Sequence, residues 1–322
     1  MVGTHLVYDL LLKGYRVKAL KRQQSNTMQV RKTFAYYSDN KTANLLYKNI
    51  EWVDGDILDF ESILEAADGC TQAYHTAAVV SFSRADRKEM MNINVGGTAN
   101  IINVCLEKKI PLCHVSSIAA LGRSSEPDGL ITENDSWQTD RGRSAYSISK
   151  HKSEMEVWRG IAEGLQAVIV NPAVVLGAGD WTKSSLKFFS QIHKGLRFHT
   201  PGITGFVDAR DVSRCMIQLM EQQRFGERFI LSAGNLSYRE LFFQIADNLK
   251  VKRPSKAAKP WMLNIAWRIA TVIAAITGKK PFLSKETAHS AFQQIRYNSE
   301  KIGYEFVPLD KCIEDCCRIF MK

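Results

Sequence analysis

The chain has 322 residues, of which 45% are hydrophobic and 24% are charged, with a formal net charge of +10. This composition is typical of a globular protein, and the length suffices for one large domain or two unequal ones. The basic residues are dispersed apart from a cluster at residues 13–32, with no stripe of interleaved aromatics, so nucleic acid is not expected as a partner.

Helix and strand patterns alternate through the first half. Apolar periodicity predicts helices at residues 4–13, 60–67, 88–108 and 144–160. Strands are predicted at residues 15–20, 50–53, 73–78, 112–116 and 167–171. This alternation predicts an α/β fold, a doubly wound parallel sheet with helices on both faces. Ligands of such sheets bind at the carboxyl ends of the strands.

The pattern loosens after Pro172. Helices are predicted at residues 186–194, 212–222 and 238–249, and a strand at 228–232. We interpret residues 1–172, with 205–222 returning to them, as a cofactor domain. Residues 173–322 would form a smaller, interwoven substrate-binding lobe.

The most apolar run, residues 261–277, is interrupted by Asn264 and Arg268 and is shorter than the ~20 residues that span a bilayer. We expect a helix packed on the protein that ends at Gly278, with peripheral membrane contact as the alternative. No signal peptide is recognised, and no stable membrane span is expected.

The chain has an odd number of cysteines, several in apolar segments, which predicts reduced thiols and a cytoplasmic location. Cys312, Cys316 and Cys317 lack a nearby fourth ligand, so we interpret them as small residues of a terminal helix and expect no metal.

Tyr146 and Lys150 lie four residues apart on a predicted helix, so both side chains share one face. A free tyrosine has a pKa of about 10, and a neighbouring lysine cation would lower it toward neutrality. Ser116 and Ser117 end the predicted strand before this helix, where a hydroxyl can reach a substrate carbonyl. The order of these features is more specific than Y-x-x-x-K alone.

The chain resembles the extended short-chain dehydrogenase/reductases of the NAD-dependent epimerase/dehydratase family, and within them the dihydroflavonol-4-reductase-like branch. The matching segments are VDGDILD (53–59), HTAA (75–78), NVGGTAN (94–100), HVSSIAALG (114–122), YSISK (146–150), NPAVVLG (171–177), FVDARDV (206–212) and YNSEKIGY (297–304). The resemblance implies a Rossmann-like domain and, for the last segment, a late helix.

The resemblance also implies roles for the matching residues. Tyr146 would be the general acid or base, Lys150 would lower its pKa and bind the nicotinamide ribose, and Ser117 would bind the reacting carbonyl or hydroxyl. The implied cofactor contacts are Gly3, Asp56, Ile57, Thr76, Ala77, Ala78, Ser116, Pro172 and Val175. Candidates for the substrate pocket are Ser81, Phe82, Phe206 and Arg210.

Lys21 and Arg22 follow the predicted strand at residues 15–20. An acidic residue there would bind the ribose 2′-hydroxyl of NAD, whereas a guanidinium suits the 2′-phosphate of NADP. No Asp or Glu stands near this strand end in the sequence. We therefore expect NADP, with NAD as the alternative.

Proteins of the resembled family begin with a strand and a G-x-x-G-x-x-G turn, of which only Gly3 is present here. We expect that the chain is truncated, by a start codon assigned too late, and that the first strand of the sheet is missing. Codons upstream of Met1 would test this expectation.

The predicted activity is an NADP(H)-dependent oxidation or reduction between a carbonyl and a secondary alcohol of a small molecule. Three alternatives stay open: a nucleotide-sugar epimerase or dehydratase with retained NAD, a 3β-hydroxysteroid-dehydrogenase-like enzyme, and a non-catalytic cofactor-binding protein. The oligomeric state is open, with a homodimer through the helices at residues 88–108 and 146–160 as one option.

Overall fold

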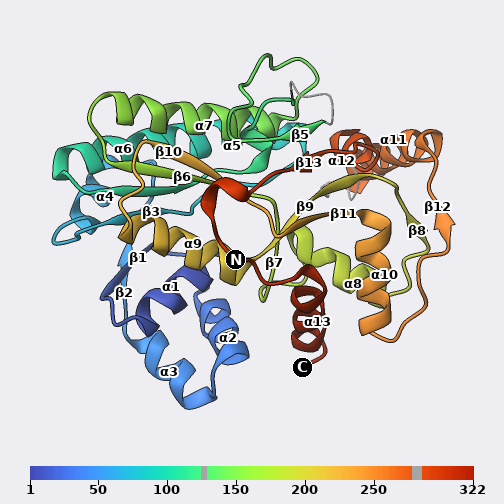
Figure 1. The fold of residues 1–322 in the computed structure, drawn as a ribbon, viewed down its shortest axis with the longest axis horizontal. Coiled ribbons are helices and arrows are strands. Elements are labelled where there is room, and N and C mark those ends of the chain that lie inside the picture. Colours follow the sequence, from blue (N-terminus) through green and yellow to red (C-terminus); the bar gives the residue numbers. More distant parts are fainter. Residues whose placement is uncertain (125–128, 278–284) are drawn as a thin grey trace.

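The structure, a computed structural model, describes residues 1–124, 129–277 and 285–322. Its centre is a parallel sheet with the strand order β10-β6-β4-β3 (Figure 1). These strands are β3 (Ala73–His75), β4 (Leu112–Val115), β6 (Ala167–Pro172) and β10 (Glu227–Leu231). Every residue of β6 is buried, because strands lie on both of its edges and helices cover both of its faces.

Two further strands, β1 (Val17–Lys21) and β2 (Ile50–Asp54), form a separate parallel pair. Among the described residues no strand connects β1 to β3. The space between these two strands belongs to the large cleft described below, which residues of both strands line.

Helices cover both faces of the main sheet, which confirms the predicted doubly wound α/β fold. On one face lie α4 (Phe60–Ala66), α6 (Gly97–Lys108) and α7 (Ala145–Ala162). On the other face α1 (Val2–Leu12) packs against α9 (Ala209–Glu221).

Two segments differ from the sequence prediction around this sheet. The helix expected at residues 88–108 is divided into α5 (Arg87–Met91), a π-helical turn at Asn92–Gly96, and α6. The strand expected to reach residue 78 ends at His75, and the Asn94 side chain binds the backbone of Val79 in the loop that follows.

The basic region after β1 forms two helices that the sequence analysis did not predict, α2 (Met28–Tyr37) and α3 (Asn40–Lys48). Their apolar residues, including Phe34 and Leu46, bury a small core with Ile50 of β2. Asp39 caps α3, since its carboxylate accepts hydrogen bonds from the backbone of Lys41 and Thr42.

The second lobe is built on a three-stranded sheet of β7 (Val174–Leu176), β9 (Ile203–Asp208) and β11 (Gly234–Ser237). Helices α8 (Lys187–His193), α10 (Tyr238–Asn248) and α13 (Leu309–Phe320) share one hydrophobic core beside it. Cys312, Cys316 and Cys317 are buried free thiols on α13. The return to the first lobe extends beyond residue 222, since β10 completes the main sheet.

The remaining elements are short, apart from one long helix. They are β5 (Leu130–Ile131), β8 (Phe198–His199), β12 (Lys256–Ala257), α11 (Pro260–Thr277), α12 (Lys285–Ser290) and β13 (Arg296–Tyr297). The late helix implied for YNSEKIGY is a single 3-10 turn at Glu300–Ile302. No described helix is long and apolar enough to cross a membrane.

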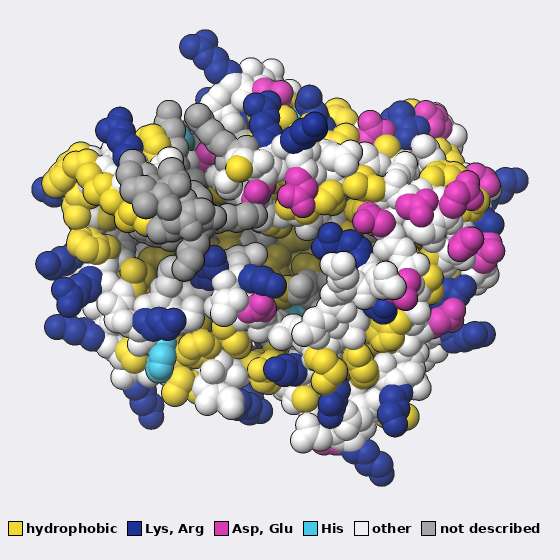
Figure 2. All heavy atoms as spheres, turned by 180° about the vertical axis from the view of Figure 1, so that it is seen from behind, with side chains coloured by type: hydrophobic (Ala, Val, Ile, Leu, Met, Phe, Trp, Pro, Cys, Tyr) yellow, Lys and Arg dark blue, Asp and Glu magenta, His cyan; other side chains and the backbone are white. Residues whose placement is uncertain are grey.

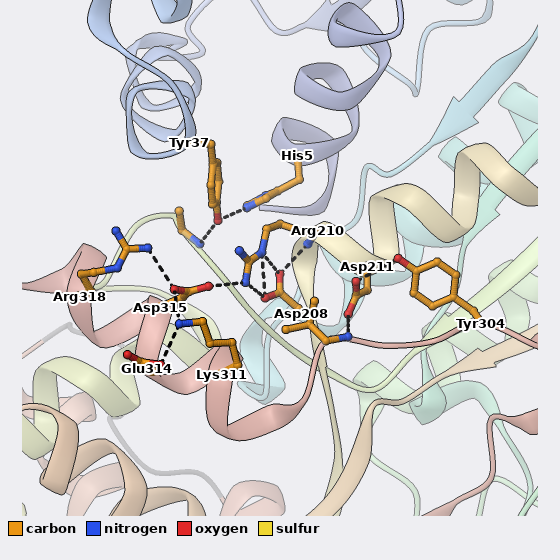
Figure 3. Close-up of polar contacts among 12 residues, drawn as sticks. His5, Tyr37, Asp208, Arg210, Asp211, Tyr304, Lys311, Glu314, Asp315 and Arg318 are labelled. Carbon is orange, nitrogen blue, oxygen red and sulfur yellow. Dashed lines mark hydrogen bonds and ion pairs between the residues drawn. The ribbon is translucent and has the colours of Figure 1, made fainter.

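A polar cluster joins the two lobes (Figure 3). Asp208 ends β9 and caps α9, and its carboxylate binds the guanidinium of Arg210 through Nε at 3.0 and 3.1 Å. Arg210 also donates to Asp315 of α13 at 3.0 Å. Nearby, His5 of α1 contacts the Tyr37 hydroxyl at 3.0 Å.

Candidate active site

A cleft of about 3100 Å³ runs along the carboxyl ends of the sheet strands and into the second lobe. It is the position predicted for a ligand of such a sheet. The predicted site residues that line it are Gly3, Ile57, Thr76, Ala77, Ala78, Ser81, Phe82, Ser116, Ser117, Tyr146, Lys150, Pro172 and Val175.

Tyr146 lies in the first turn of α7, which Ser144 caps by accepting a hydrogen bond from Ser147 N at 2.9 Å. Its ring meets the edge of Phe82 at a centroid distance of 5.8 Å. Burial raises the pKa of Tyr146, and the nearby Ser117 side chain opposes this rise in the pKa. The two hydroxyls predicted to hold a reacting oxygen are therefore neighbours.

Lys150 follows one turn later and is 2% exposed. Its Nζ donates to the backbone oxygen of Val115 at 2.8 Å, at the end of β4. Burial lowers the pKa of Lys150 to about 8, and the carboxylate of Glu154 opposes this shift in the pKa. The predicted effect of Lys150 on the pKa of Tyr146 stays a prediction.

A buried polar network behind Lys150 was not predicted. Glu154 accepts hydrogen bonds from Ser116 Oγ at 2.6 Å and Asn171 Nδ2 at 2.8 Å, and it pairs with Arg228 Nη1 at 3.1 Å. The Ser116 hydroxyl thus donates its proton to Glu154 and could meet a cofactor only as an acceptor. The sequence signal for Glu154 was its position four residues after Lys150, which places both side chains on the same face of the predicted helix.

Asn94 is a second residue that the sequence analysis missed. Its side chain is buried, accepts from Val79 N at 2.7 Å, and donates to Val79 O at 2.9 Å and Ser149 Oγ at 3.0 Å. Ser149 in turn donates to the backbone oxygen of Tyr146 at 2.8 Å. Asn94 therefore fixes the loop after β3 against the start of α7. The sequence signals for this residue were an amide inside a predicted apolar helix and its place at the start of the matching segment NVGGTAN (94–100).

The loop after β3 also meets the start of α1. A Cβ added to Gly3 would lie 2.7 Å from Thr76 Oγ1, so any larger residue at this position would require the Thr76 side chain to move. The first turn of α1 carries no side-chain cap, and a helix N-terminus favours an anion such as a phosphate. These features fit a dinucleotide cofactor.

Three of the four residues expected at the adenosine end, Lys21, Arg22 and Asp56, lie outside the cleft lining. Lys21 forms an ion pair with Asp54 of β2, which corrects the expectation that no acidic residue stands near this strand end. Arg22 is exposed beside it. Asp56 shapes a turn, since its carboxylate accepts from Leu58 N at 3.0 Å, and the neighbouring Ile57 reaches the cleft.

Two proposed substrate contacts are corrected. The Phe206 side chain is fully buried in the core of the second lobe, where it contacts Tyr238 edge-on. Arg210 is held by Asp208 and Asp315 and does not line the cleft. Phe206 lies in β9 and Arg210 in the first turn of α9, on either side of Asp208, and neither lines the cleft.

The fold and the cleft define an α/β enzyme of the dinucleotide-binding class. Residues 1–232 match the model of the NAD dependent epimerase/dehydratase family, and the chain belongs to this family. The expected extended short-chain dehydrogenase/reductase assignment is thereby confirmed, as is an NAD(P)-dependent enzyme.

Several named relatives align with most of this chain. "Sterol demethylase protein B" of Methylococcus capsulatus is 28% identical over 94% of this chain and 87% of that protein. A dihydroflavonol 4-reductase of Dianthus caryophyllus is 26% identical over 72% of this chain and 66% of that protein. The crystal structure of gox2253 superposes with a TM-score of 0.80 and 25% identity, covering 100% of this chain and 95% of that chain.

Proposed function

We propose that the protein is an NADP(H)-dependent oxidoreductase that interconverts a carbonyl and a secondary alcohol. The observation that carries the proposal is that Ser117, Tyr146 and Lys150 line the same cleft, with Ser117 close to Tyr146 and Lys150 one helical turn away. Family membership supports nicotinamide chemistry at this position.

In the reductive direction, Ser117 and Tyr146 would donate hydrogen bonds to the carbonyl oxygen of the substrate. Tyr146 then gives its proton to this oxygen as negative charge develops there. The nicotinamide supplies the hydride when it is bound. Lys150, which donates to the backbone oxygen of Val115 and lies near Glu154, would bind the ribose and stabilise the phenolate.

Tyr146→Phe tests the proton-transfer role. Turnover should fall by at least about a hundredfold, the usual contribution of a general acid. Cofactor affinity, measured by fluorescence titration, should change little because the ring and its contact with Phe82 are retained. Wild-type turnover in this variant would refute the role of Tyr146.

The preference for NADP rests on Arg22, because Asp54 already neutralises Lys21. Arg22→Ala should weaken NADPH binding by about tenfold, the value of one charge-assisted phosphate contact, and leave NADH binding unchanged. Paired titrations with NADPH and NADH measure this difference. Equal weakening for both cofactors would contradict a 2′-phosphate contact.

The substrate is proposed to be a small organic or ring ketone. A sterol-like ketone is a second candidate, favoured by the relative named for sterol demethylation and by the apolar residues Phe198 and Leu263 at the far end of the cleft. An epimerase or dehydratase would retain its nicotinamide cofactor through the cycle. Tightly bound NAD in the purified protein would favour that alternative.

A further inference from the structure

The outer face of α11 carries a row of exposed apolar side chains. Trp261, Ile265, Ile269 and Ile273 are 60%, 48%, 52% and 48% exposed. Their spacing of four residues places them along one side of the helix. Isolated exposed apolar residues are ordinary, but a continuous row of this kind marks an interaction surface.

The opposite side of α11 is attached to the protein. Ala270 is buried, Leu263 lines the cleft, and α12 packs against the helix. The helix is therefore held by one face and presents the other outward. Figure 1 places it at the edge of the second lobe, on the far side of the molecule from α2 and α3.

The sequence on both sides of this helix is strongly basic. Between Asp247 and Glu286 the sequence contains nine Lys or Arg residues and no Asp or Glu. Lys252, Lys256 and Lys259 are exposed just before the helix, and Arg268 is exposed beside the apolar row. Figure 2 shows a hydrophobic patch at this edge of the molecule with Lys and Arg side chains around it.

We propose that α11 docks the protein onto the surface of an anionic phospholipid membrane. The four apolar side chains would enter the boundary between headgroups and acyl chains, where tryptophan is favoured. The surrounding lysines and arginines would contact the anionic headgroups.

The charge pattern selects a membrane over a second copy of the chain. An interface between two copies would bring two such basic segments together, and like charges oppose association. An anionic lipid surface neutralises them instead. Because Leu263 lines the cleft from the inner face of the same helix, docking would hold the cleft next to the lipid.

Vesicle flotation of the full chain tests the proposal. We expect binding to vesicles of equal parts phosphatidylcholine and phosphatidylglycerol, and much weaker binding to phosphatidylcholine alone or at high salt. Replacing both Ile265 and Ile269 with Glu should reduce binding by about a hundredfold or more. The matched control replaces two exposed leucines elsewhere, Leu12 and Leu45, with Glu and should bind like the wild type.

A second variant tests the electrostatic part without touching the helix. Replacing Lys252, Lys256 and Lys259 with Gln should abolish the preference for phosphatidylglycerol. Quenching of Trp261 fluorescence by brominated lipid, with Trp261→Phe as the reference, reports insertion directly. Absence of wild-type binding, or unchanged binding of the Ile265/Ile269 variant, would overturn the proposal. The proposal would also be overturned if sedimentation velocity showed a wild-type dimer and a monomeric Ile265/Ile269 variant, because the apolar row would then bind a second copy of the chain.

Discussion

At the scale of single residues, the surroundings of Lys150 favour its neutral form. Its side chain is buried beside His75 and His114, whose rings lie 5.1 Å apart. Burial and the charge of Lys150 lower the pKa of His75 to about 3, so this ring stays neutral. A buried ammonium is costly, and retaining it here is consistent with a role in the reaction rather than in folding.

Lys150→Met should therefore raise the free energy of unfolding at pH 7 by about 1–3 kcal/mol while removing activity. The folded-state pKa of about 8 lies below the ordinary value of 10.5, so between these pH values the unfolded chain binds more protons at this site. Wild-type stability should rise with pH across that window, and the advantage of the variant should shrink. Urea unfolding at several pH values measures both effects.

Lys152→Met is the control, because Lys152 lies on the same helix and is exposed. Its stability should change by less than about 0.5 kcal/mol. A Lys150→Met protein that is no more stable than the wild type at pH 7 would contradict the cost of the buried ammonium.

At the scale of elements, α6 and the turn after β2 are fitted closely to each other. Asn100 Nδ2 donates to the backbone oxygen of Ile57 at 3.0 Å. A Cβ added to Gly97 would lie 2.5 Å from Ile57 Cδ1, whereas one added to Gly96 would meet nothing closer than 3.6 Å. The approach of the two elements positions Ile57 in the cleft.

Gly97→Ala should destabilise the fold by about 1–3 kcal/mol through overpacking, and it should weaken cofactor binding because Ile57 is displaced. Gly96→Ala is the matched control and should be neutral or stabilising by up to about 1 kcal/mol. Thermal unfolding and a cofactor titration compare the two variants. If the two variants had the same stability and the same cofactor affinity, the contact between Gly97 and Ile57 would not position the turn after β2.

At the scale of the whole molecule, the lobes are joined by the charged cluster around Asp208 (Figure 3). Asp208 is 1% exposed, and Arg210 connects it to Asp315 of α13. Arg318, also paired with Asp315, lies at the surface with a side chain that is 58% exposed. Removing the partner of a buried carboxylate strongly lowers the free energy of unfolding, whereas an ion pair at the surface contributes little to it.

Arg210→Met should lower the free energy of unfolding by about 2–4 kcal/mol, because Asp208 then loses its charged partner. Arg318→Met should cost less than about 0.5 kcal/mol. Chemical denaturation of both variants measures the difference. Equal effects would contradict the proposed dependence of the lobe junction on Arg210.

The sequence by itself determined the fold class, most of the element order and the family, because apolar periodicity and ordered motifs are local properties of the chain. It also predicted Ser117, Tyr146 and Lys150 as the site residues, because their positions at the end of one strand and on one helix can be read from local patterns. Only the tertiary structure showed that Glu154 and Asn94 support them, since their partners lie up to 74 residues away. The burial of Phe206 and the pairing of Lys21 with Asp54 were likewise decided by packing between distant segments, which no local pattern encodes.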